Sequence, residues 1–347
     1  MTDTNLVSVK RVVYDDADVH VVNAARISFA KKVDKFRDAD KGLLNFLARH
    51  NHWTPFAHVR IGARTRSSAV VERVMGGNSY SDRLKSAGFV SVKDGEFYYI
   101  SGSLYGWLQL VDKYHKKGTA VTNAERRMYT EILGMLYSIA PNSFDAWFGE
   151  GGNPVVSYEN SHKYSLSYVE DHNLPREIQS LTVHCKMPVP IARQVFKSNH
   201  LTIVYNEISR RYVALWPAIK PIYQWRRAAT DAKQGSSGAL GKVRAWLASR
   251  LYNGLCRAAL VRYKMLLMLG VAPEQARFVL PQGMEVEFYM TAVVQDFERV
   301  VELRSDPTAQ GEVQVFAEGL LKALQEHRDY NIFTETVDSI DNVINNN

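Results

Sequence analysis

The sequence predicts an α/β (α+β) fold with an inserted, mainly helical subdomain, on three observations. Strand-like segments at residues 7–13, 56–63 and 182–186 alternate with segments whose apolar side chains recur at helical spacing. The character of the sequence changes between residues 65 and 181, where glycine-rich and aromatic stretches appear. The chain has 347 residues, 46% of them apolar and 11% aromatic, so it is long and apolar enough to bury a substantial core.

The N-terminal elements follow from this pattern in order. The β-rich strand at residues 7–13 leads into a helix at residues 18–30, and a second helix with leucines along one face is expected at residues 40–50. This second helix ends before Pro55, because proline restricts the preceding residue to extended geometry. The strand at residues 56–63 follows.

The segment 65–181 is interpreted as an inserted subdomain, with amphipathic helices near residues 103–114 and 123–139. After it, the strand at residues 182–186 precedes a short helix that begins at Pro188 and extends through Phe196, since proline suits a first helical turn. The remaining elements are a flexible loop at residues 233–238, helices at 241–269, 273–280, 291–304 and 312–327, and a frayed, asparagine-rich tail at 331–347.

Composition narrows the possible functions. The formal charge of +7 favours anionic partners, either nucleic acid or small phosphorylated ligands. No run approaches the ~18–20 apolar residues of a membrane span, and the start lacks a signal-peptide pattern, so we expect a cytoplasmic protein without membrane contact. Cys185 and Cys256 show no metal or redox spacing, so we expect inert thiols and no covalent thiolate catalysis. Redox or transfer chemistry would then need a bound cofactor.

The densest group of ligand-binding side chains lies between residues 188 and 213. Its cations suit phosphate, and its amide, carboxylate and hydroxyl groups suit the edge of a nucleobase or a flavin. The cations are Arg193, Lys197, Arg210 and Arg211, and the other polar groups are Gln194, Asn206, Glu207 and Ser209.

Two further arginines lie on predicted helices among apolar neighbours. Arg304 continues the apolar stripe of the helix at residues 291–304. Arg277 likewise lies among apolar neighbours on the helix at residues 273–280. A guanidinium at the buried edge of a helix needs an acceptor. That acceptor is either an acidic side chain of the protein or the carbonyl, imide or phosphate of a ligand.

Three histidines, His50, His52 and His58, lie close together around a proline turn. They lack a helical i, i+4 pair and a nearby carboxylate, so capping or core hydrogen bonding explains them better than metal ligation. We assign no metal.

Five segments carry motifs in a fixed order, and together they resemble the flavin-dependent thymidylate synthase family. The order makes chance agreement improbable. The segments are Asn-Ala-Ala-Arg-Ile-Ser-Phe at 23–29, the helix and Thr-Pro-Phe-Ala-His turn at 44–58, Pro-Ile-Ala-Arg-Gln-Val-Phe at 190–196 with Tyr-Asn-Glu-Ile-Ser-Arg-Arg-Tyr at 205–212, and the C-terminal blocks at 270–281 and 303–314.

This resemblance implies a mixed sheet flanked by helices and a homotetramer that binds FAD and dUMP where subunits meet. NADPH reduces the FAD, methylenetetrahydrofolate supplies a methylene group to dUMP, and flavin hydride completes the methyl group of dTMP. No cysteine nucleophile is required. The implied organisation is a catalytic domain formed by residues 1–64 and 182–330, an insertion at 65–181 and a tail at 331–347.

The resemblance also assigns site residues. Arg304 and Ser209 are expected to be catalytic, with Arg304 facing the uracil imide, where a fixed cation stabilises negative charge on the pyrimidine. The residues expected to bind dUMP are Arg193, Gln194, Glu207, Ser209, Arg210, Arg211, Arg277 and Arg304. Those expected to contact FAD are Ser28, Thr54, Lys197, Ser198, Asn199, His200, Glu207, Gln295 and Arg299.

The chain departs from the family pattern in three places. The Arg-His-Arg triplet of the family falls on residues 197–199 or 199–201, depending on the register, and neither restores both arginines. We expect a small insertion in this loop, with Lys197 and His200 keeping a cation and an imidazole near the flavin. Val293, Gln295 and Arg299 replace residues that are often Asn, Arg and Asn in the family, and the segment 65–181 resembles nothing that we can name.

Two alternatives remain open from the sequence. One is a flavoenzyme that releases a hydroxymethyl product from dUMP, and the other is a non-catalytic homologue that binds nucleotide or nucleic acid. Nucleic-acid binding is the weaker alternative, because the basic residues lie among Asn, Glu and Ser and form no aromatic-spaced basic stripe. If the chain is virus-encoded, the host cytoplasm is the expected location. The sequence leaves open the reductant preference, the role of the insertion and whether activity is retained.

Overall fold

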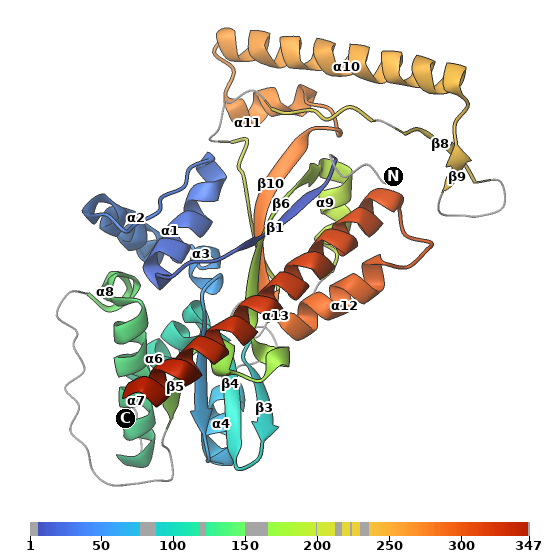
Figure 1. The fold of residues 1–347 in the computed structure, drawn as a ribbon. Helices are drawn as coiled ribbons and strands as arrows, with labels where there is room; N and C mark the ends of the chain where they lie inside the picture. The colour runs from blue at the N-terminus through green and yellow to red at the C-terminus, as the bar shows by residue number, and fades with distance from the viewer. Residues whose placement is uncertain are drawn as a thin grey trace.

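The computed structural model describes residues 6–76, 88–117, 123–149, 166–198, 200–211, 217–222, 224–229 and 236–345. The described residues form two four-stranded sheets and one two-stranded hairpin, with helices around them (Figure 1). In the first sheet the strand order is β1 (Ser8–Val12), β6 (Ser180–Pro188), β10 (Glu285–Val293), β7 (Val204–Glu207). In the second sheet it is β3 (Val90–Asp94), β4 (Phe97–Ser103), β2 (Arg60–Thr65), β5 (Ser167–Val169). Each pairing of these strands is antiparallel.

One face of the first sheet carries a hydrophobic core. Paired residues of antiparallel strands point to the same face, and the pairs Val183–Met290 and Cys185–Phe288 are fully buried. This face packs against helices that contribute Phe297, Phe316 and other apolar side chains to the same core. The helices are α9 (Val189–Val195), α12 (Val294–Arg304) and α13 (Gly311–Asn345).

A second core joins the N-terminal helices to the segment 65–181. Phe56 and Ile61 belong to the same buried cluster as Trp107 and Phe144, so residues on both sides of position 64 share one interior. The division at residues 64 and 181 therefore stays a prediction. The helices around this core are α1 (Ala17–Arg26), α2 (Asp38–Arg49), α3 (Thr54–Ala57), α4 (Ser68–Gly76), α6 (Leu104–Lys117), α7 (Asn123–Ile139) and α8 (Pro141–Phe148).

A buried carboxylate connects α1 to α8 across this core. Asp18 is 1% exposed and accepts hydrogen bonds from the backbone N and side-chain Nδ2 of Asn142, both at 2.9 Å. It also accepts from the backbone N of Ser143 at 2.8 Å and from its Oγ at 2.5 Å. These backbone groups lie in the first turn of α8, where helical N–H groups have no partner within the helix. Asp18 therefore caps α8 from a distant part of the sequence.

Replacing Asp18 with alanine is expected to lower the free energy of unfolding by about 3 kcal/mol, because it leaves buried donors unsatisfied. The matched control is Asp38→Ala, whose side chain is 98% exposed and should change stability by less than about 0.5 kcal/mol. Urea unfolding of the two variants measures the difference. Equal midpoints would show that Asp18 does not anchor α8.

The structure confirms the α/β class and many of the predicted elements, and it corrects four of them. Residues 54–57 are helical, so the strand predicted at 56–63 begins only at Arg60. The helix predicted at 291–304 begins at Val294, because residues 285–293 form β10, which pairs on both sides. Part of the loop predicted at 233–238 is strand β9 (Ser236–Ala239), paired with β8 (Arg226–Ala228), and residues 233–235 lie outside the described part. The tail predicted to be frayed continues α13 as far as Asn345.

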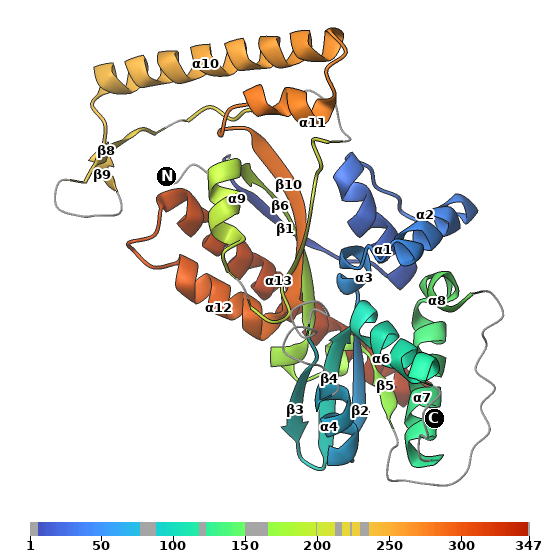
Figure 2. The ribbon, with the colours of Figure 1, turned by 180° about the vertical axis from the view of Figure 1, so that it is seen from behind.

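Helix α10 (Lys242–Met268) lies at the edge of the molecule, away from both sheets, in both views (Figures 1 and 2). It contacts α11 (Pro273–Ala276) and the 3₁₀ turn η5 (Arg277–Val279). Only Cys256, Ala259 and Tyr263 are buried along its described length. Away from these three residues α10 exposes a stripe of apolar side chains, at Val243, Leu247, Leu251, Leu255, Val261 and Met265.

Candidate functional site

The end of β7 and the turn after it gather residues that the sequence analysis assigned to one site. The 3₁₀ turn η1 (Ile27–Phe29) lies beside this segment. Ser28 Oγ donates to the carbonyl oxygen of Glu207 at 3.0 Å, and the backbone N of Ser209 donates to the carbonyl of Ser28 at 3.0 Å. The structure thus brings the N-terminal Ala-Ala-Arg-Ile-Ser motif against the Asn-Glu-Ile-Ser-Arg-Arg motif.

Three arginines lie near enough to Glu207 to act on its charge. Partial burial raises the pKa of its carboxyl group, while the positive charges of Arg277, Arg193 and Arg210 oppose that rise. These cations come from η5, α9 and the turn after β7, so the tertiary fold brings them together. Three guanidinium groups around one carboxylate leave a positive excess, which suits a phosphate.

Glu274 of the short helix α11 contacts two arginines of the same site. Its carboxylate lies 3.5 Å from Nε of Arg211, and its carbonyl oxygen accepts a hydrogen bond from Nε of Arg277 at 3.2 Å. Both arginines were predicted to bind the nucleotide. One acidic residue therefore orients two of the predicted cations.

Arg304, the last residue of α12, is held by neutral acceptors. Its Nε and Nη2 lie 3.1 and 3.0 Å from Oγ of Ser198, and Nη2 also donates to the carbonyl of Gln194 at 2.7 Å. No carboxylate of the described residues forms an ion pair with it, so the acidic partner that the sequence analysis considered is absent there. The side chain of Gln194 instead donates to Gln310 at 2.7 Å.

The residues predicted to contact FAD differ in exposure within the described part of this chain. Lys197 and Gln295 are exposed, and Arg299 is exposed and paired with Asp296 at 3.3 Å. Thr54 begins α3 and is half-buried, as is His200 near the end of the turn that leads to β7. Ser198 is 1% exposed and engaged with Arg304, and Asn199 lies outside the described residues.

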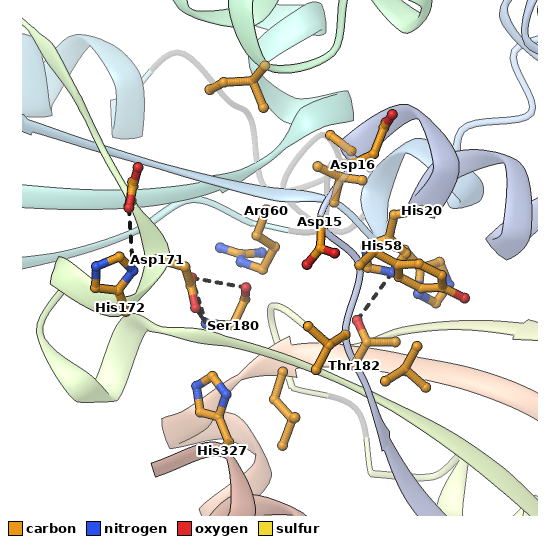
Figure 3. A pocket seen from close by; sticks show the side chains of 18 of the residues that line it. Asp15, Asp16, His20, His58, Arg60, Asp171, His172, Ser180, Thr182 and His327 are labelled. Atoms are coloured by element: carbon orange, nitrogen blue, oxygen red, sulfur yellow. Dashed lines mark hydrogen bonds and ion pairs between the residues drawn. The ribbon is translucent and has the colours of Figure 1, made fainter. Parts of the chain in front are cut away.

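A cavity that the sequence did not reveal lies between the two sheets. Its volume is about 650 Å³, and its walls come from residues 11–20, 58–60, 138–139, 168–172 and 180–182, with His327 of α13 (Figure 3). A cavity of this size matches a small-molecule site. No motif spacing brings these six segments together, so the sequence alone offered no signal for it.

A chain of hydrogen bonds lines one wall of this cavity. His20 Nε2 lies 3.3 Å from Thr182 Oγ1, the two hydroxyls of Thr182 and Thr291 are 2.7 Å apart, and Thr291 lies 2.7 Å from Nδ1 of His58. Burial lowers the pKa of His20 to about 3 and lowers that of His58 well below its usual value. His58 is thus a core histidine, while His50 and His52 pack against the ring of Phe46.

The opposite wall combines charges of both signs. Burial lowers the pKa of Arg60 to about 10, with Asp171 and Asp296 opposing the fall. Burial raises the pKa of Asp171 to about 6, although Ser180 donates to this carboxylate from its backbone N at 2.9 Å and from its hydroxyl at 3.0 Å. This part of the lining therefore carries both a cation and a carboxylate.

Lowering the pH from 6.5 to about 4 is expected to destabilise the protein, because the unfolded state takes up protons that the buried histidines exclude. For His20, whose folded-state pKa is the lower one, stability is present above pH 6.5 and lost below it. His20→Gln should reduce the loss of unfolding free energy between about pH 8 and pH 4 by about 3 kcal/mol. Urea unfolding between about pH 8 and pH 4 measures the slope, and the value at about pH 8 gives the cost of the substitution itself. An unchanged slope would contradict the assignment.

The two cysteines are buried, Cys185 in β6 and Cys256 in α10, and burial raises the pKa of both thiols. Neither is therefore activated as a nucleophile. Among the described residues, no helix combines the length and apolar character needed to cross a membrane, and no three metal-ligating side chains of His, Cys, Asp or Glu cluster together.

Residues 109–327, more than half of the chain, match the sequence family described as thymidylate synthase complementing protein (Thy1). A flavin-dependent thymidylate synthase of Thermus thermophilus is 34% identical over 179 residues, covering 52% of this chain and 64% of the relative. The chain thus spans slightly less than two thirds of that relative. The enzyme of the same name from Thermosipho melanesiensis is 30% identical over 197 residues, covering 56% of this chain and 83% of the relative.

A longer alignment joins this chain to the flavin-dependent thymidylate synthase of Aquifex aeolicus, at 26% identity over 312 residues, 88% of this chain and 93% of the relative. An alignment of that extent includes much of the segment 65–181, so this relative has a counterpart of it. A solved structure of a UMP/dUMP methylase from Streptomyces cacaoi aligns with 94% of this chain and 91% of its own, at 16% identity and a TM-score of 0.41. The match over residues 109–327 and the 83% coverage of the Thermosipho relative confirm the predicted family: this chain belongs to the thymidylate synthase complementing protein (Thy1) family.

Proposed function

We propose that this protein is a flavin-dependent thymidylate synthase, which converts dUMP to dTMP with methylenetetrahydrofolate as carbon donor and NADPH-reduced FAD as hydride donor. The observation that carries the proposal is the group of Arg193, Arg210 and Arg277 around Glu207, beside Ser28 and Ser209. The names of the Thermus, Thermosipho and Aquifex relatives support the same activity.

In this proposal the arginine group binds the phosphate of dUMP, because guanidinium groups form charge-assisted, fork-shaped contacts with phosphate oxygens. Arg211 adds a cation at the same turn, and Ser209 supplies a hydroxyl group there. Gln194, at the end of α9, offers an amide to the nucleotide beside Arg304. Glu207 completes the group as a hydrogen-bond acceptor with a raised pKa.

Arg304 is placed at the uracil imide. Its charge is not neutralised by an acid among the described residues, so it can stabilise negative charge that develops on the ring and make the carbon that receives the methylene group more nucleophilic. FAD, when bound, would supply the hydride. The buried thiols of Cys185 and Cys256 take no part in this chemistry.

The flavin site requires a second copy of the chain in this proposal. Lys197, Gln295 and Arg299 are exposed cations and amides suited to FAD phosphates and ring edges, but the described residues of one chain do not enclose them. The exposed apolar side of α10 offers a surface for self-association, because monomers rarely expose a stripe of this kind. We therefore propose a homotetramer with active sites shared between subunits.

The test is an assay of purified protein with FAD, dUMP, methylenetetrahydrofolate and NADPH, with the product identified by mass. Formation of dTMP, together with oxidised-flavin absorbance that stays with the protein, is the expected result. A hydroxymethyl product would show that the enzyme is a hydroxymethylase and not a synthase. Failure to bind FAD, combined with tight and salt-sensitive DNA binding, would overturn the proposal.

A further inference from the structure

We propose that Ser198 is the positioning residue of Arg304, which it holds through an uncharged acceptor so that the guanidinium keeps its full charge for the pyrimidine. This inference rests on the proposed function and deepens it. It also changes the role of Ser198, which the family resemblance placed at the flavin.

The Ser198 hydroxyl is fixed by the turn that ends α9. Its side chain is 1% exposed, and its backbone N donates to the carbonyl of Val195 at 2.9 Å. The hydroxyl of Tyr205 lies 3.4 Å from the carbonyl oxygens of both Val195 and Ser198, which ties the turn to β7. A buried hydroxyl on a hydrogen-bonded turn is a rigid acceptor.

The contacts use one edge of the Arg304 guanidinium. Nε and Nη2 both point to Oγ of Ser198, at 3.1 and 3.0 Å, and the second Nη2 proton goes to the carbonyl of Gln194 at 2.7 Å. That carbonyl belongs to the last turn of α9, and it also accepts a hydrogen bond from the backbone N of Lys197 at 3.3 Å. Nη1 makes no hydrogen bond with the described residues, so it remains for a ligand.

Because the Ser198 hydroxyl is uncharged, its contact with Arg304 has an electrostatic consequence. A carboxylate in the place of this hydroxyl would attract the guanidinium and compensate its charge. A serine oxygen fixes the same edge without that compensation. The positive charge of Arg304 is therefore left uncompensated by this contact, as stabilisation of an anionic pyrimidine requires.

Three variants of Ser198 test the role of its hydroxyl group. Ser198→Ala removes the acceptor, Ser198→Thr keeps the hydroxyl, and Ser198→Asp holds the guanidinium but compensates its charge. Ser305→Ala is the matched control, because Ser305 is the exposed next residue at the end of α12. In the FAD-loaded enzyme, we expect Ser198→Ala to lower kcat about 30-fold with KM for dUMP changed less than about threefold. Ser198→Thr should recover most of the loss, and Ser198→Asp should not.

A binding measurement without turnover separates this inference from the proposed function. The fluorine of 5-fluoro-dUMP makes the imide more acidic, so at about pH 9 calorimetry compares an anionic ring with the neutral ring of dUMP. Wild-type protein should prefer 5-fluoro-dUMP about tenfold, and Ser198→Ala should lose this preference while still binding dUMP. If wild-type protein binds neither nucleotide, the proposed function fails. If both bind and Ser198→Ala keeps the preference and kcat, or loses FAD in proportion to activity, the role of Ser198 is wrong.

Discussion

Replacing Arg304 with alanine is expected to lower kcat for dUMP methylation about a thousandfold while the protein remains folded. In the described structure Arg304, at the end of α12, is held only by uncharged groups, and this variant removes its guanidinium. Its structural cost is limited to hydrogen bonds with Ser198 and Gln194, worth about 1–2 kcal/mol of unfolding free energy. Steady-state kinetics at saturating dUMP, together with thermal unfolding, separate the two effects.

Arg304→Lys refines this expectation. Lysine keeps the charge but lacks the planar fork that contacts Ser198 and Gln194 together, so we expect an activity between those of the wild type and Arg304→Ala. Arg328→Ala removes an exposed arginine of α13 that pairs only with Asp329 in the described structure, and it serves as the control. Near-normal turnover of Arg304→Ala would remove Arg304 from the catalytic site.

The residues assigned to the nucleotide come together in the structure largely because they lie in short, nearly continuous motifs. Glu207 and Ser209 are close in the chain, and Arg193 precedes them by one turn and one strand. Their contact with Ser28 follows from the packing of η1 against β7, which no local rule specifies. The assignment of these residues to dUMP, and of the others to FAD, stays a prediction.

The strand β10 escaped prediction although its sequence carried a signal. Residues 285–289 alternate Glu-Val-Glu-Phe-Tyr, with Val286 and Phe288 buried on the core face. From residue 290 onward both faces are buried, so the alternation disappears and a helix of residues 291–304 fits equally well by spacing. Pairing with β6 and β7 decides the outcome, and pairing is a tertiary effect.

The segment 65–181 illustrates the limit of motif comparison. It contains helices, as predicted, but its strands β4 and β5 flank β2 on both sides, and its side chains complete the interior around α1 and α3. Asp18 also depends on this segment, because its hydrogen-bond partners in α8 lie more than a hundred residues away in the sequence. We therefore infer that the segment stabilises the N-terminal elements, and that its removal would expose their core.

Replacing Leu251 and Leu255 of α10 with glutamate is expected to dissociate the assembly and abolish dUMP methylation. These side chains are 75% and 64% exposed in the single chain, while Cys256 and Tyr263 of the same helix are buried. A helix that is apolar on both sides is normally covered on both sides, so the exposed stripe favours burial against another copy. Two charges at its centre would have to be buried unpaired in the assembly, at a cost of several kcal/mol for each.

Light scattering measures the mass of the assembly, and flavin absorbance measures the retained FAD. Lys264→Glu is the matched control, because it places the same charge on α10 at a position that is already exposed and charged. The expected result for the double variant is a folded monomer or dimer that has lost FAD, because in the proposed homotetramer a second chain completes the flavin site. A double variant that remains tetrameric and active would show that the α10 stripe is not the interface. A monomer that keeps FAD and activity would show instead that one chain suffices for the site, and the exposed side chains of Lys197, Gln295 and Arg299 would then need another role.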